Sequence, residues 1–193
     1  MKDNALILFF ILFQINCFSQ HQIKGVEIPT HLEAKGINLE LKGAGVRTFM
    51  WMNMYVGGIY LEENQNISPK IIAKDQSMGL RLQIISSLVS NKRIIQALEE
   101  GFEKGAEGGL ASLQNRIDQL IDFFEEDIQP GDSIDLIYKN NEKSYTHVYR
   151  NAKYLGKIEG YDFKKALFGI WISDQPADEK MKQQILEGIL MIY

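Results

Sequence analysis

The sequence of 193 residues has few of the residues that build metal and thiol sites. It contains one cysteine, Cys17, and three histidines, His21, His31 and His147, and no two histidines stand four residues apart. Structural zinc sites need several thiolate or imidazole ligands, and thiol catalysis needs a cysteine inside the folded domain. The sequence therefore predicts no metal site, and no motif in it indicates a cofactor.

An excess of basic residues is also absent. The chain has 21 Lys and Arg against 25 Asp and Glu, a formal net charge of -4, and no run of five or more like charges. Because a nucleic-acid-binding surface needs a basic face, nucleic acid is excluded as a partner. The content of 45% hydrophobic and 24% charged residues is typical of a globular domain. Nothing in the composition indicates a particular protein partner.

No apolar run is long enough to cross a membrane. The longest, residues 5–13, has nine residues, about half of the ~18 that a spanning helix needs. Lys2 precedes this run, and the small side chains of Cys17 and Ser19 follow it just before Gln20. This arrangement is typical of a secretory signal peptide, so we expect export to the periplasm or outside the cell and no stable membrane span.

Cleavage at that point would remove residues 1–19 and with them the only cysteine. Lipid anchoring at Cys17 is not favoured, because Gln14 and Asn16 do not match the aliphatic and small residues that this processing requires. The remaining residues 20–193 contain no low-complexity, Pro-rich or Gly/Ser-rich linker, so they are predicted to form a single domain.

The spacing of apolar residues predicts the order of the secondary-structure elements. Strands are expected as a long pair within 36–63, joined near 48–52, and then at 78–84, 134–138, 145–149 and 154–159. Helices are expected at 68–75, 94–102, 113–124, 162–172 and 177–190. This order favours the α+β class, with an antiparallel sheet covered by helices on one face.

Arg47 lies in an apolar and glycine-rich strand segment. A guanidinium group does not lose its proton, so an inward-facing Arg47 must meet an anion or several acceptors. Tyr55 follows on the next expected strand, and the adjacent Gly57 and Gly58 would leave space beside the sheet. An arginine and a tyrosine hydroxyl can together bind a carboxylate. The spacing alone leaves open that Arg47 is paired with an acidic residue of the chain.

The segment 39–62 resembles the chalcone isomerase-like family. It contains Leu-Glu-Leu-Lys-Gly-Ala-Gly-Val-Arg, ending at Arg47, and Tyr-Val-Gly-Gly-Ile-Tyr-Leu-Glu, beginning at Tyr55. Further similar segments follow the same order along the chain, at 26–29, 82–102, 130–132 and 163–171. The resemblance implies an open-faced β-sandwich, in which a large antiparallel sheet is covered by helices around a cleft.

Enzymes of this family use an arginine together with a tyrosine and an asparagine from the helical layer. Arg47 resembles that arginine, but no tyrosine occurs between Tyr60 and Tyr138, and Tyr55 stands where the enzymes carry a strand threonine. The sequence therefore favours a non-catalytic protein, and no catalytic residue is assigned. Two alternatives stay open: an intramolecular lyase or isomerase of altered chemistry that uses Arg47 and Tyr55, and a protein-interaction module with a vestigial cleft.

Non-catalytic members of the family bind fatty acids through an arginine and a tyrosine. The resemblance implies that Arg47 and Tyr55 hold the carboxylate of a fatty acid or a similar apolar acid, in a cleft between sheet and helices. The candidate wall residues are Trp51, Met54, Phe102, Leu120, Phe124 and Trp171. The hypothesis requires that Arg47 lies beside an apolar cavity and is not neutralised by an Asp or Glu of the chain itself.

Overall fold

A computed structural model describes residues 20–105, 109–141 and 143–188. The strands are β1 Gln20–Ile23, β2 Val26–Pro29, β3 His31–Ala34, β4 Ile37–Phe49, β5 Met52–Leu61, β6 Met78–Ile84, β7 Ser133–Lys139, β8 Tyr145–Arg150 and β9 Lys153–Glu159. The helices are α1 Asn91–Gly105, α2 Gln114–Asp122, α3 Tyr161–Ile172 and α4 Glu179–Glu187, with short 3-10 turns η1 Ile71–Ala73 and η2 Leu110–Ser112. The expected signal peptide, residues 1–19, lies outside the described residues.

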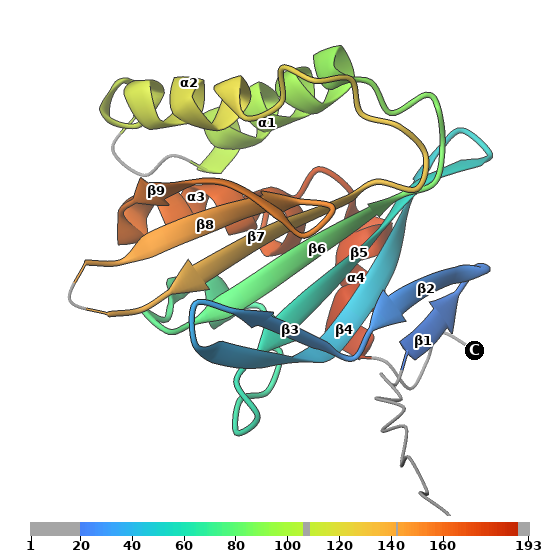
Figure 1. Cartoon of the computed structure of the whole chain (residues 1–193), viewed down its shortest axis with the longest axis horizontal. Coiled ribbons are helices and arrows are strands. Elements are labelled where there is room, and N and C mark those ends of the chain that lie inside the picture. Colours follow the sequence, from blue (N-terminus) through green and yellow to red (C-terminus); the bar gives the residue numbers. More distant parts are fainter. Residues whose placement is uncertain (1–19, 106–108, 142, 189–193) are drawn as a thin grey trace, which may run out of the picture.

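Strands β3 to β9 form one seven-stranded antiparallel sheet in which every strand pairs with its neighbours in the sequence. Helices cover one face of this sheet, and the β1–β2 hairpin lies apart from them (Figure 1). The α+β class with helices on one face of an antiparallel sheet is confirmed. The long pair predicted within 36–63 is β4 and β5, and the chain turns back between Phe49 and Met52.

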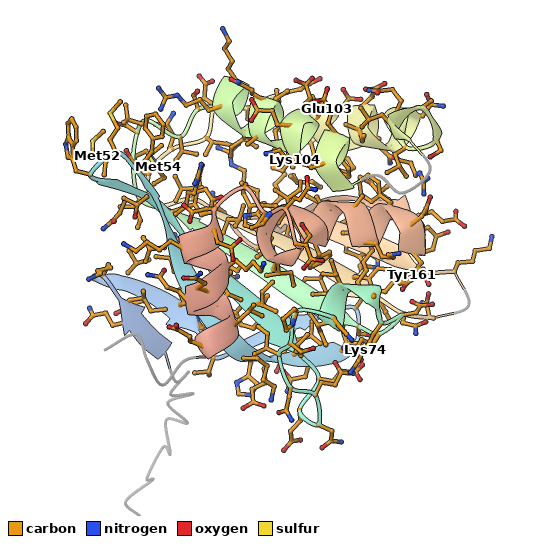
Figure 2. All side chains as sticks on the ribbon, turned by 180° about the vertical axis from the view of Figure 1, so that it is seen from behind. Met52, Met54, Lys74, Glu103, Lys104 and Tyr161 are labelled. Carbon is orange, nitrogen blue, oxygen red and sulfur yellow. The ribbon has the colours of Figure 1, made fainter. Side chains whose placement is uncertain are left out.

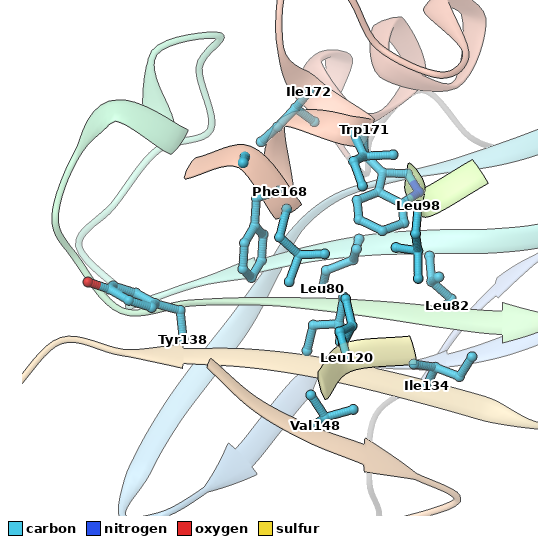
Figure 3. Packing of buried hydrophobic residues seen from close by; sticks show 14 of the residues in the cluster. Leu80, Leu82, Leu98, Leu120, Ile134, Tyr138, Val148, Phe168, Trp171 and Ile172 are labelled. Atoms are coloured by element: carbon cyan, nitrogen blue, oxygen red, sulfur yellow. The ribbon is translucent and has the colours of Figure 1, made fainter. Parts of the chain in front are cut away.

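The main hydrophobic core lies between the sheet and the helices. Leu80 and Leu82 of β6 contribute to it together with Phe168 and Trp171 of α3 and Leu98 of α1 (Figure 3). Alternation along β6 explains this packing, because side chains two residues apart share one face of a strand. The apolar stripes of the helices are buried against that face.

A second, smaller core covers the other face of the sheet. Ile23 and Ile28 of the β1–β2 hairpin are buried there with Leu39, Val56 and Tyr60 of the sheet. The sequence analysis assigned no strands to residues 20–34, because each of these strands has only four residues and carries little periodicity. The hairpin therefore covers part of the second face, so that each face of the sheet carries a hydrophobic core.

The helix expected at 68–75 is wrong, since only η1 forms there. Lys164 Nζ, from α3, donates to the carbonyl oxygens of Ile72 at 3.0 Å and Lys74 at 2.7 Å. These hydrogen bonds hold the short turn against α3.

Helix α4 lies directly on the β4–β5 pair. A Cβ on Gly45 would come within 2.5 Å of the carbonyl oxygen of Met181, and one on Gly43 would overlap the carbonyl of Ile185. The backbone N–H of Val46 also donates to Gln184 Oε1 at 2.8 Å. The glycines of β4 therefore allow backbone contact with α4, which places the start of this helix beside the end of β4.

Candidate functional site

A cavity of about 390 Å³ lies between the helix-covered face of the sheet and helices α1 and α3. This volume is within the range of ~300–1,000 Å³ that is usual for small-molecule sites. Its apolar walls are formed by Phe49, Met54, Leu82, Val89, Ile94, Ala97, Leu98, Leu120, Phe124, Ile134, Leu136, Ile170, Trp171 and Ala177. The charged residues that line it are Arg47, Arg93 and Glu100. The cavity is thus mostly apolar, with two guanidinium groups against one carboxylate.

Arg47 and Tyr55 are brought together at this cavity. They stand directly opposite each other on β4 and β5, so their side chains share the helix-covered face of the sheet. An irregularity in the pairing follows immediately, between Arg47 and Thr48. Arg47 and Tyr55 are the polar groups of the sheet that line the cavity.

Arg47 is paired with an acidic residue of the chain, so the requirement of the sequence-based hypothesis that no Asp or Glu neutralises it is not met. Its Nη1 donates to Asp178 Oδ2 at 2.5 Å. The Arg47 side chain is 30% exposed and that of Asp178 is 13% exposed. A guanidinium carries five N–H donors, and within the described ranges Arg47 uses only this one hydrogen bond. Arg47 therefore keeps donors for a second acceptor, although its charge is already partly compensated.

Asp178 makes a second interaction beside Arg47. Its Oδ1 accepts from the backbone N–H of Met181 at 2.8 Å and so caps the N-terminus of α4. One carboxylate thus connects the end of β4 with the start of α4. The sequence analysis did not single out Asp178. An Asp just before a helical pattern signals a helix cap, but nothing local indicates a contact 131 residues away.

Tyr55 is held by Trp171 of α3, whose indole Nε1 donates to the tyrosine oxygen at 3.2 Å. In the described part of the chain, the hydroxyl proton of Tyr55 has no acceptor. Burial raises the pKa of Tyr55 above its usual value, although the Trp171 hydrogen bond and the Arg47 charge act in the opposite direction. Tyr55 therefore stays protonated at neutral pH and offers a hydrogen bond to the cavity.

Four of the candidate wall residues, Met54, Leu120, Phe124 and Trp171, line the cavity. Two do not. Trp51 is 82% exposed at the turn between β4 and β5. Phe102 of α1 is fully buried against Phe163, with ring centroids 5.3 Å apart, and belongs to the core beside the cavity. Sequence alone did not distinguish these positions, because all six side chains are large and apolar.

Arg93, near the start of α1, is a lining residue that the sequence analysis missed. Its guanidinium carbon lies 5.8 Å from the centre of the Phe49 ring. Across the described residues it has no hydrogen bond or ion pair to an acidic side chain. Arg93 is therefore a cation at the cavity that no carboxylate of the described chain neutralises.

The described ranges contain no cluster of three or more His, Cys, Asp or Glu side chains able to hold a metal ion. None of the helices within 20–105, 109–141 and 143–188 combines the length and the apolar character needed to cross a bilayer.

A search of curated proteins finds no match to this chain. A search of solved structures finds the crystal structure of a fatty-acid binding protein of Arabidopsis thaliana, with a TM-score of 0.69 and 15% sequence identity. The match covers 88% of this chain and 96% of that one. At this identity the likeness shows the fold. A sequence model of the chalcone isomerase-like family matches residues 20–187, and the chain therefore belongs to the chalcone isomerase-like family.

Proposed function

We propose that this protein binds a fatty acid or a similar apolar carboxylate in the cavity between the sheet and α1. The single observation that carries the proposal is the pairing of an apolar cavity of about 390 Å³ with Arg47 and the Tyr55 hydroxyl at one place on its wall. The fold shared with a fatty-acid binding protein supports it. We further propose that Arg47, Tyr55, Met54 and Phe124 contact the ligand.

The carboxylate would accept hydrogen bonds from the unused donors of Arg47 and from the hydroxyl of Tyr55. Because Asp178 already pairs with Arg47, the ligand either shares the guanidinium or displaces that carboxylate. Arg93 lines the same cavity and adds a second positive charge. Because Asp178 offsets the charge of Arg47, Arg93 is the cation of the cavity wall that no ion pair within the described residues offsets.

Burial of the alkyl chain would supply most of the affinity. A chain of ~12 to 16 methylenes contributes ~10 to 13 kcal/mol when buried at ~0.8 kcal/mol each. Association and ordering of the ligand cost a large part of this energy. Arg47 and Tyr55 would then fix the direction of the ligand more than the strength of its binding.

No tyrosine occurs between Tyr60 and Tyr138, where the enzymes of the family carry a tyrosine in the helical layer, and this favours binding over catalysis. Burial raises the pKa of Tyr55, so its hydroxyl keeps its proton at neutral pH and can donate a hydrogen bond to a bound anion. We therefore propose a non-catalytic role, and turnover of a chalcone or an enone that is lost in Arg47→Met is the result that would favour the isomerase alternative.

The test compares hexadecanoic acid with hexadecanol, which has the same chain without the carboxylate. Calorimetry should show the acid bound more tightly than the alcohol by about tenfold or more, and Arg47→Met should abolish the difference. Tyr55→Phe should weaken the binding of the acid but not that of the alcohol. Tyr154→Phe, on exposed β9, should change the affinity for neither ligand. Absence of an acid from solvent extracts of the purified protein, together with no heat on titration, contradicts the proposal.

The compartment is a separate part of the proposal. We propose that residues 1–19 act as a secretory leader and that the protein works in the periplasm or outside the cell, as their sequence pattern favours. Amino-terminal sequencing of the protein from its native host should begin at Gln20. A chain that retains Met1 and Lys2 would contradict export.

A further inference from the structure

Four pairs of neighbouring strands are joined by turns of two residues. Such turns favour Gly, Asn or Asp, because at least one residue takes a positive φ. Three of the turns follow this preference or use a lysine with glycine. Their residues are Lys24-Gly25, Lys35-Gly36 and Asn151-Ala152. The fourth, between β4 and β5, is Met50-Trp51.

The Met50-Trp51 turn departs from this chemistry because it contains no Gly, Asn or Asp and both of its residues are apolar. Met50 has a φ of 55°, close to that of Lys24 and Lys35 in their turns, but no glycine follows it. Met50 is also 70% exposed and Trp51 82% exposed, and the adjacent Phe49 is 44% exposed. These three consecutive residues are the most exposed large hydrophobic side chains of the described chain. Neither folding nor solubility accounts for them, which points to a role in binding.

This apolar tip adjoins the cavity. Phe49 lines the cavity and lies under the guanidinium of Arg93, which lines it too. Figure 2 shows Met52 and Met54, which follow the turn, at one end of the molecule and far from Lys74 and Tyr161 at the other. Whatever covers the tip therefore also lies next to the cavity.

We propose that Phe49, Met50 and Trp51 insert into the surface of a phospholipid bilayer and present the cavity to it. Tryptophan and phenylalanine are favoured at membrane interfaces, where an apolar side chain meets polar headgroups. Arg93 and its neighbour Lys92 are exposed cations in the first turn of α1, which contains no acidic residue. They lie where they can meet lipid phosphates while the tip enters the apolar region.

A second copy of the chain, or another protein, fits the tip less well. At ~200 Å² for a large side chain, the exposed parts of the three residues amount to roughly 400 Å². A stable complex covers ~800 Å² on each partner. A protruding hairpin tip with a small apolar area matches insertion into a soft interface better than docking onto a rigid one.

The test uses binding to vesicles of phosphatidylcholine, alone and mixed with phosphatidylglycerol. The matched variant is Met50→Gly/Trp51→Ser, which removes the apolar tip and gives the turn a residue suited to positive φ. The wild type should bind the vesicles, and the variant should bind about tenfold or more weakly. Tyr154→Ser, which removes the other exposed large hydrophobic side chain among the described residues, should bind as the wild type does.

Tryptophan fluorescence reports directly whether the tip enters the bilayer. The sequence has two tryptophans, so Trp171→Phe leaves Trp51 as the only reporter. Its emission should shift to the blue on addition of vesicles and should be quenched by brominated lipids. Failure of the wild type to bind either vesicle, or equal binding by the Met50→Gly/Trp51→Ser variant, overturns the inference. The inference is also overturned if the wild type is a dimer that does not bind vesicles and the variant is a monomer.

Vesicle binding does not depend on whether the cavity holds an acid. Calorimetry with hexadecanoic acid in detergent-free buffer tests the cavity, and vesicle binding tests the tip. If the protein binds the acid but not vesicles, only the proposed membrane-docking role is wrong. If the protein binds vesicles but no acid, the membrane-docking role stands and the proposed ligand is wrong.

Discussion

Arg47 and Asp178 form an ion pair, with Nη1 and Oδ2 2.5 Å apart, that joins the end of β4 to the cap of α4. The other oxygen of Asp178 holds the backbone N–H of Met181. An acid that reaches Arg47 thus meets a carboxylate already in place. Two negative groups beside one guanidinium repel each other, so the charge of Asp178 lowers the affinity for an acid.

Asp178→Asn should therefore increase the affinity for hexadecanoic acid. Asparagine caps helices about as well as aspartate, so α4 should keep its start while the competing charge disappears. Because Arg47 is partly exposed, we expect a gain of ~1–2 kcal/mol, which is about tenfold in affinity. Calorimetry with the acid measures the gain, and hexadecanol should show none.

Glu179→Gln is the matched control, because it removes the same charge from the next residue. Glu179 is exposed and pairs only with Lys182, at 3.4 Å, among the described residues. It should leave the affinity for the acid unchanged. An equal gain in both variants would show a general effect of charge, and a loss in Asp178→Asn would show that Asp178 helps to hold the ligand.

The sequence predicted much of this geometry and missed its most important contact. The β4–β5 pair was predictable because the two strands are consecutive and joined by a short turn, and that pairing places Arg47 opposite Tyr55. Asp178 could not be predicted as the partner of Arg47, because the contact depends on how α4 lies across the sheet. Local patterns describe neighbours along the chain, whereas this contact is set by tertiary packing.

The two tryptophans show the same limit. Trp51 and Trp171 both stand in apolar segments, and both were expected to line the cleft. Trp171 is buried beside Tyr55, whereas Trp51 lies at the tip of a hairpin. Its place in a two-residue turn was the available signal, since side chains at such a turn lie outside the sheet and rarely reach a core.

The contact between α4 and the sheet should be sensitive to single methyl groups. A Cβ on Gly43 would overlap the backbone carbonyl of Ile185, which cannot move without the helix. A Cβ on Gly57 would overlap only the terminal methyl of Met181, which can rotate away. We expect Gly43→Ala to lower the free energy of unfolding by about 2–3 kcal/mol and Gly57→Ala by about 1 kcal/mol.

Urea unfolding of both variants measures whether Gly43→Ala lowers the free energy of unfolding more than Gly57→Ala does. The Gly43→Ala variant should also strengthen the binding of the acid, because a displaced α4 moves the competing Asp178 carboxylate away from Arg47. Equal stability of the two variants would contradict the close packing of α4 on β4.

Lys164 should make the stability depend on pH in the alkaline range. It is fully buried, and this burial lowers its pKa from 10.5 to about 8, while the nearby Asp75 partly opposes the shift. Between these two values the unfolded chain binds the proton that the folded chain has lost. Stability from this group therefore increases as the pH rises from about 8 to about 10, by up to ~3 kcal/mol.

Lys164→Met removes this dependence. The variant loses the hydrogen bonds to Ile72 and Lys74, so we expect it to be less stable than the wild type at every pH. The difference between the two should widen as the pH rises through this window, since only the wild type gains. Urea unfolding at several pH values measures the change, and Lys180→Met, on the exposed side of α4, should follow the wild type. A constant difference across the window would show that Lys164 keeps its proton when buried.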